Sequence, residues 1–198
     1  MSTPETFDAI IIGAGPAGIF TALELTALQP QARVLMVDTG RAIVNRFCPA
    51  RATGHCAHCV PCAIVHGWAG AGAFSDGKLS LSDEVGGHVA DYLGRAEAQA
   101  LIRRADEIYL RFGASTEVHG LDNQKVDDIA YQATRYNIRL VPCPVRHLGT
   151  ECAGQVLGGM HDHLVNHTRT QFRELTDALD MLVRDGRAVG VRLRGKDG

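Results

Sequence analysis

Four cysteines lie close together in the sequence with the spacing C-x7-C-x2-C-x2-C, at Cys48, Cys56, Cys59 and Cys62. Four thiolates at short spacings can bind zinc or an iron–sulfur cluster. Two thiols at C-x-x-C spacing can instead form a redox dithiol, here Cys59 with Cys62 or Cys56 with Cys59. Small cysteines can also simply pack a loop that has little other core. The spacing leaves these three alternatives open.

A glycine-rich stretch, residues 67–77, follows the cysteines. A loop with so little side-chain bulk can lie flat against a planar ring or a phosphate group. The hydroxyl of Ser75 and the ammonium group of Lys78 add polar groups that can meet a phosphate. A flexible surface loop is the alternative, but this stretch is more apolar than an ordinary loop tip. We therefore predict cofactor contacts from Gly70, Gly72, Ser75 and Lys78.

The first forty residues carry the pattern that would position such a cofactor. Residues 7–12 form a short apolar run typical of a buried parallel strand, and an amphipathic helix follows. Between them, Gly13, Gly15 and Gly18 form the motif G-x-G-x-x-G. The first glycine permits the turn, the second lets the backbone approach a pyrophosphate, and the third lets the helix pack on the strand. The helix N-terminus offers N–H groups and a positive dipole end to the phosphates.

A second strand, residues 32–38, ends in Asp38. An acid at about this distance from the glycines binds the ribose hydroxyls of a dinucleotide. Strand, glycines, helix, second strand and acid together predict a dinucleotide-binding unit. The alternative, a glycine turn without a ligand, accounts for fewer of these features. We expect cofactor contacts from Gly13, Gly15, Pro16, Ala17, Gly18 and Asp38.

The motif GAGPAG, with its Pro16, resembles that of the glutathione-reductase-like FAD proteins. Residues 48–87, with C-x-x-C-x-x-C followed by GWAGAGAFSDGKLSLSDEVGG, resemble the poorly characterised FAD-dependent dehydrogenases of that superfamily. The stretch RHLGTECAGQVLGGMHDHL is similar to a helix start in the same group. Two positions depart from the family pattern: Ala69 stands where a glycine is expected, and Asp38 stands where many members have glutamate.

This resemblance implies an α/β fold: a Rossmann-like FAD-binding domain with a parallel sheet and a β-meander or hairpin near the C-terminus. It also implies an FAD-dependent oxidoreductase that moves a hydride or electrons through the flavin, with NAD(P)H as a candidate electron donor. The substrate is not indicated, and the residues supply no convincing acid–base pair or nucleophile. The alternatives are a geranylgeranyl-reductase-like flavin reductase of a lipid and a non-catalytic FAD- or metal-binding remnant.

Flavoproteins of the resembled type return to the FAD-binding fold near their C-terminus through a glycine–aspartate motif. The sequence carries neither that motif nor a substrate domain. We therefore expect the N-terminal part of a longer enzyme, whose C-terminal half would be its partner, and a sheet that lacks its last strand. An exposed apolar sheet edge and weak FAD affinity would follow.

The composition of the 198 residues, 45% hydrophobic and 21% charged, is that of an ordinary globular domain. A net charge of −2 predicts no attraction to nucleic acid. No apolar run reaches the roughly 18 residues of a membrane span, and the N-terminus lacks the basic region of a signal peptide. Six cysteines fit a reducing cytoplasm, where metal binding or redox chemistry is more common than a structural disulfide.

The remaining elements follow from periodicity and turn residues. Amphipathic or otherwise helical patterns, and one short strand, are predicted as follows: helices at residues 91–114, 123–137 and 149–167, and a strand at 138–142. The dipeptide Asp185-Gly186 between two apolar runs predicts a β-hairpin. The expected organisation is a dinucleotide unit at 1–40, a cofactor loop at 48–87, a helical segment at 88–168 and a β-meander at 170–198.

Overall fold

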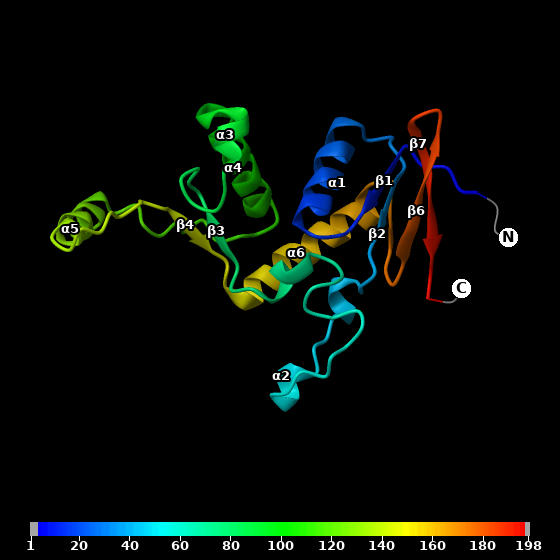
Figure 1. Ribbon diagram of the computed structural model, residues 1–198, viewed down its shortest axis with the longest axis horizontal. Helices are drawn as coiled ribbons and strands as arrows, with labels where there is room; N and C mark the ends of the chain where they lie inside the picture. Colours follow the sequence, from blue (N-terminus) through cyan, green and yellow to red (C-terminus); the bar gives the residue numbers. More distant parts are fainter. Residues whose placement is uncertain (1–3, 197–198) are drawn as a thin grey trace. The chain divides into compact units, whose positions relative to one another are not determined.

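The computed structural model describes residues 4–196, except for the side chains of Thr150 and Glu151. The chain divides into two compact units. The first unit comprises Met1–Phe74 and Leu157–Gly198, and the second comprises Ser75–Val156. Figure 1 shows the order of the elements along the chain. No helix in the described part of the chain is both long enough and apolar enough to cross a membrane.

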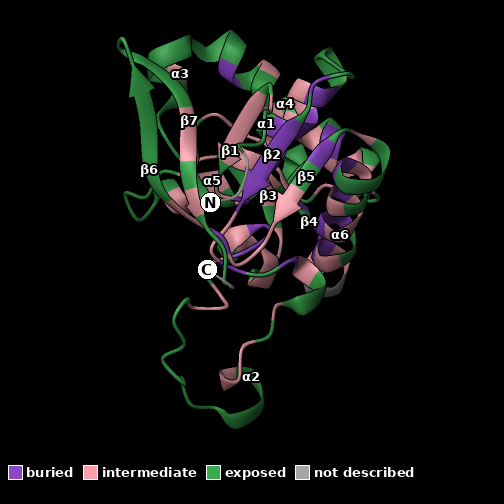
Figure 2. Ribbon diagram, turned by 90° about the vertical axis from the view of Figure 1, so that its right-hand side faces the viewer, coloured by how far each residue is buried: buried purple, intermediate pink, exposed green. Residues whose placement is uncertain are grey.

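A parallel sheet of three strands forms the centre of the first unit. Its strands, in the order β1-β2-β5, are β1 (Ala9–Ile12), β2 (Val34–Val37) and β5 (Thr170–Arg173). The central strand β2 pairs on both sides and is buried along its whole length (Figure 2). This explains why its sequence is continuously apolar instead of alternating.

Two long helices supply much of the core of the first unit. Helix α1 (Pro16–Leu28) connects β1 to β2, and helix α6 (Gly149–His167) leads into β5. Buried side chains from α1, β2 and the C-terminal part of α6 make up this core, among them Ile19, Leu35, Met160 and Leu164. Parallel strands joined through helices are the arrangement that a Rossmann-like fold requires, and the predicted fold class is confirmed.

A β-hairpin near the C-terminus consists of β6 (Asp177–Arg184) and β7 (Arg187–Arg194). Both residues of its turn have positive φ, +50° for Asp185 and +73° for Gly186. This is the conformation of the tight turns that match the twist of paired strands, so the hairpin prediction is confirmed.

The segment between β2 and the second unit has little regular structure. It contains three short helices: η1 (Ile43–Asn45), α2 (Ala50–Thr53) and η2 (Gly70–Phe74). Cys56, Cys59 and Cys62 lie in the irregular stretch between α2 and η2, and Cys48 lies just before α2.

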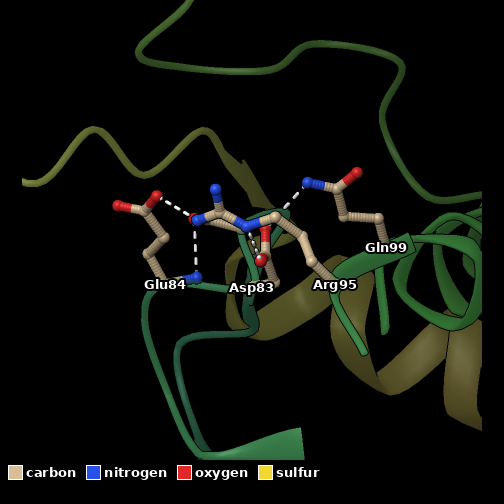
Figure 3. A network of polar contacts seen from close by, with 5 residues as sticks. Asp83, Glu84, Arg95 and Gln99 are labelled. Carbon is tan, nitrogen blue, oxygen red and sulfur yellow. Dashed lines mark hydrogen bonds and ion pairs between the residues drawn. The ribbon is translucent and has the colours of Figure 1, made fainter. Parts of the chain in front are cut away.

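The second unit consists of helices and a small antiparallel pair of strands. Its elements are β3 (Lys78–Ser80), α3 (Val89–Leu93), α4 (Arg95–Arg111), α5 (Asn123–Thr134), β4 (Val145–His147) and the start of α6. The side chain of Arg95 binds the carboxylates of Asp83 and Glu84, and Gln99 donates to Asp83 at 3.0 Å (Figure 3). These contacts fix the start of α4 to the segment that precedes α3.

Two expectations about this unit are wrong. The helix predicted at 91–114 is two helices, because Gly94 adopts φ +81° and interrupts the helical backbone between α3 and α4. The strand predicted at 138–142 is not formed, and the chain pairs only from Val145 onward. Pro142 and Pro144 have no backbone N–H, so neither can donate to a strand ladder.

Candidate dinucleotide-binding site

The glycine motif forms a tight turn between β1 and α1. Gly13 has φ +98°, a conformation that disfavours any residue with a Cβ. A Cβ placed on Gly18 would lie 2.0 Å from the carbonyl oxygen of Gly13, so α1 approaches the turn more closely than a side chain permits. The spatial roles predicted for these two glycines are confirmed.

The N-terminus of α1 is open. Gly15 is its N-cap residue, no side chain caps this end, and the first turn carries no acidic residue. A Cβ on Gly15 would meet no atom within 4 Å. The helix start thus has no side-chain cap and open space beside the Cα of Gly15, as an anion-binding helix start requires.

Asp38 ties three backbone segments together. One carboxylate oxygen accepts hydrogen bonds from the amides of Gly40 and Gly67, both at 2.7 Å, and the other accepts from the amide of Ala14 at 2.8 Å. Each carboxylate oxygen has about two lone-pair sites, so Oδ2 keeps one acceptor position. The sequence pattern predicted a ribose contact for Asp38 and missed these three structural bonds.

The glycine-rich loop lies against the glycine turn. The amide of Ala69 donates to the carbonyl oxygen of Ala14 at 2.7 Å, and a Cβ on Gly70 would lie 3.6 Å from the Cα of Gly15. Ala69 is fully buried and has φ +65°, a left-handed backbone at the position where the resembled family has glycine. The structure thus brings Ala69 and Gly70 of the glycine-rich stretch to the glycine turn, within the first unit.

Arg46 holds this loop in place, and sequence reasoning did not identify it. Its guanidinium donates to the carbonyl oxygens of Ala63, Ile64, Trp68 and Gly70. Burial is the main reason that the pKa of Arg46 is lowered from its ordinary value, and the charge of Asp38 opposes that effect. All its bonds go to backbone atoms, so no side-chain pattern in residues 63–70 signals them.

Trp68 anchors the loop from inside. Its ring is fully buried, and Nε1 donates to the carbonyl oxygen of Leu157 at 2.8 Å. The ring packs edge-on against His161 and Phe172, with centroid separations of 4.7 and 5.3 Å. A large buried aromatic side chain with a satisfied N–H stabilises the loop conformation on which Gly70 depends.

Ser75 and Lys78 belong to the second unit. Ser75 Oγ accepts from the amide of Gly77 at 3.2 Å, and Lys78 pairs with Asp76 at 2.8 Å. The hydrogen bond from Lys78 lowers the pKa of the Asp76 carboxyl. The cofactor contacts assigned to Ser75, Lys78 and Gly72 remain predictions.

The cysteine run gives no support to a metal site. Within residues 4–196, no three histidine, cysteine or acidic side chains come together in a way that could hold a metal ion. Cys48, Cys56, Cys59 and Cys62 are all free thiols, with Cys56 and Cys59 exposed. The arrangement of the described residues therefore does not support the zinc and iron–sulfur alternatives.

No protein-family model matches the sequence, and no curated protein matches it either. Solved structures do match. The L-amino acid deaminase from Proteus vulgaris superposes with a TM-score of 0.52 at 13% identity, covering 98% of this chain and 45% of the deaminase. The chain is similar in fold to that enzyme. The same deaminase with its specific insertion sequence deleted gives a TM-score of 0.50 at 12% identity, covering 98% of this chain and 51% of the other. The chain thus spans about half the length of these proteins.

Proposed function

We propose that the first unit binds FAD through its ADP portion and serves an FAD-dependent oxidoreductase. The observation that carries this proposal is the convergence of Gly15, Asp38 and Gly70 around the open N-terminus of α1. The likeness in fold to an amino acid deaminase is consistent with it.

Each element has a distinct task in this proposal. The first-turn amides of Ala17 and Gly18 in α1 bind the pyrophosphate, which can approach because Gly15 has no side chain, while Pro16 presets the helical backbone without an N–H of its own. The remaining acceptor position of Asp38 Oδ2 takes a hydrogen bond from a ribose hydroxyl, and its negative charge disfavours a 2′-phosphate there. Gly70 and Gly72 let the loop backbone lie close to the cofactor. When bound, FAD supplies the capacity to accept and release a hydride or electrons, while the chain positions it.

The proposal extends to the chemical class of the substrate and not to an individual compound. The enzyme of similar fold is named an L-amino acid deaminase, and we propose a small organic substrate of that kind for this chain. The described residues contain no acid–base pair at the glycine turn to which we assign a role in the reaction.

The ribose contact can be tested with ADP and 2′-deoxy-ADP as competitors of FAD, followed by flavin fluorescence. We expect the wild-type protein to bind ADP about tenfold more tightly than 2′-deoxy-ADP, because a hydrogen bond to a charged acceptor contributes about 1.5 kcal/mol or more. Asp38→Asn should weaken FAD binding and abolish most of this preference.

Asp8→Asn is a matched control. Asp8 also accepts a backbone hydrogen bond, from the amide of Arg33 at 2.7 Å. It precedes β1, however, and so lies at the opposite end of that strand from the glycine turn. Asp8→Asn should keep the wild-type affinities for ADP and for 2′-deoxy-ADP. Equal affinities of the wild-type protein for the two nucleotides would refute the ribose assignment, and failure to bind either nucleotide or FAD would refute the proposed function.

A further inference from the structure

The first unit contains a cavity of about 580 Å³ beside the segment that follows Asp38. Its wall includes Arg41, Arg46, Cys59, Cys62, Arg194 and Lys196. Two thiols and four cationic side chains therefore share one cavity. None of the two thiols and four cationic side chains is among the groups assigned above to FAD, although the cavity also borders Thr39 and Gly40, which follow Asp38.

The cavity distinguishes between the two C-x-x-C pairs. Cys59 and Cys62 both line it, whereas Cys56 does not. Cys59 is exposed and can be reached from solvent, while Cys62 is only partly exposed. The carbonyl oxygen of Cys62 accepts from the amides of Val65 and His66, at 3.2 and 3.0 Å, so this residue is held at the start of a helical turn. One thiol is accessible and the other is held in place.

The charges around the two thiols favour an anionic ligand. Among the described residues of the wall, the single carboxylate is Asp177, and Arg194 pairs with it at 2.8 Å. Arg46 lies close enough to Cys62 to interact with it electrostatically, although its N–H groups bind carbonyl oxygens. Arg41 and Lys196 form no ion pair with any residue in the described range, so their charges act on whatever enters. A cationic cavity raises the local concentration of small anions.

We propose that Cys59 and Cys62 are a redox-active dithiol that reduces a small anionic disulfide bound in this cavity. The Cys59 thiolate attacks one sulfur of the disulfide, forming a mixed disulfide and releasing one thiolate, which takes up a proton. The Cys62 thiolate then attacks Cys59 Sγ, forming the Cys59–Cys62 disulfide and releasing the second thiolate, which is also protonated. Two cysteine thiols lose two electrons and two protons, and one disulfide becomes two thiols.

Oxidised glutathione is a suitable probe because it is a disulfide that carries several carboxylates. The reduced full-length protein is incubated with it, and the products are mapped by mass spectrometry. We expect a Cys59–Cys62 disulfide in the wild-type protein and a stable glutathione adduct on Cys59 in Cys62→Ser. Cys56→Ser is the matched control from the same run of cysteines and should still form the Cys59–Cys62 bond. A Cys56–Cys59 bond in the wild-type protein, or no intramolecular bond, overturns the proposal.

The role of the charges is tested by comparing oxidised glutathione with cystamine, a cationic disulfide. The quantity measured is the rate of oxidation of the protein by oxidised glutathione divided by its rate of oxidation by cystamine. We expect this ratio to be about tenfold lower in Arg41→Ala/Lys196→Ala than in the wild-type protein. Taking the change in the ratio removes the difference in intrinsic reactivity between the probes. An unchanged ratio overturns the anionic preference. FAD affinity of the same variants is measured separately, so a failure here is distinct from a failure of the proposed function.

Discussion

His161 is held between two aromatic rings in the first unit. Its imidazole packs edge-on to Trp68 and to Phe172, with centroid separations of 4.7 and 5.6 Å. Burial lowers the pKa of His161, and the nearby carboxylates of Asp162 and Glu174 act in the opposite direction. The folded protein therefore prefers the neutral imidazole. An unfolded chain, with an ordinary histidine pKa of about 6.5, binds the proton more readily.

This difference predicts a loss of stability in acid. As the pH falls below about 6.5, the unfolded state takes up the proton first, so the free energy of unfolding decreases until the folded-state pKa is passed. His161→Phe keeps an aromatic ring in place and should show a weaker decrease between pH 7.5 and 5. Urea denaturation at several pH values measures it. His55→Gln, a change at an exposed loop histidine, should retain the wild-type dependence; identical curves for His161→Phe and wild type would contradict the prediction.

At the residue scale, the sequence identifies positions whose role depends on neighbours in the chain. Gly13 and Gly18 are predictable because one turn and one helix start require them. The bonds of Asp38 to Gly67 and those of Arg46 to the loop are not predictable, because these partners meet only when the fold is complete. A bond to a backbone atom also leaves no trace in the residue type of the acceptor.

Within helices, alanine substitutions at two glycines distinguish the effect of close packing on stability from the effect of helix propensity. Gly18→Ala would place a methyl group against the carbonyl oxygen of Gly13, whereas a Cβ on Gly158 in α6 would meet no atom within 4 Å. We expect Gly18→Ala to destabilise the first unit by about 2 kcal/mol or more and to weaken FAD binding. Gly158→Ala should stabilise the protein by about 0.5 to 1 kcal/mol, since alanine loses less entropy in a helix. Urea denaturation compares the two, and equal effects would contradict the packing argument.

The predicted helices and the predicted turn are correct where the periodicity of apolar residues agrees with the positions of turn-forming residues. The helices at 123–137 and 149–167 appear as α5 and α6, and the turn at Asp185-Gly186 forms as expected. The prediction of a strand at 138–142 failed because the apolar residues of this run were given more weight than Pro142 at its end and Pro144 just beyond it. Apolar content favours burial in any element, while a strand also needs backbone donors that proline lacks.

At the scale of the whole molecule, the second unit has its own stabilising centre. Arg146 in β4 forms two hydrogen bonds with Asp106 in α4, at 2.6 and 2.7 Å, and also donates to the carbonyl oxygens of Ser115 and Glu117. Its side chain is only 5% exposed. One buried guanidinium thereby joins a helix, a loop and a strand.

Asp106→Asn should reveal how independent the two units are. Leaving Arg146 without its carboxylate should cost about 3 kcal/mol, because a buried charge loses its partner. Hydrogen exchange should show the loss of protection in residues 75–156, with FAD binding retained by the first unit. Asp128→Asn, at an exposed position of α5, should change stability by no more than about 0.5 kcal/mol. Equal loss of protection in both units would show that they unfold together.

The fold class was predictable because it depends on one short pattern of strand, glycines, helix and strand in residues 7–38. The strand order was not, since β5 lies far along the chain from β2, with which it pairs. Nothing in the local sequence of Thr170–Arg173 specifies that partner. Pairing between distant segments is decided by the packing of the complete unit.

The contacts of Arg46 have a consequence for how freely the loop can vary. Within the described residues, the hydrogen bonds of the guanidinium go only to carbonyl oxygens, which every amino acid supplies; the group also lies over the ring of Phe74, 4.7 Å from the centroid. Substitutions at exposed loop positions therefore leave the hydrogen bonds of Arg46 intact. The exposed side chains of the loop can change, in evolution or in a designed library, while its backbone keeps the same conformation. Lysine at position 46 would end this tolerance, because one ammonium group cannot reach the same set of oxygens.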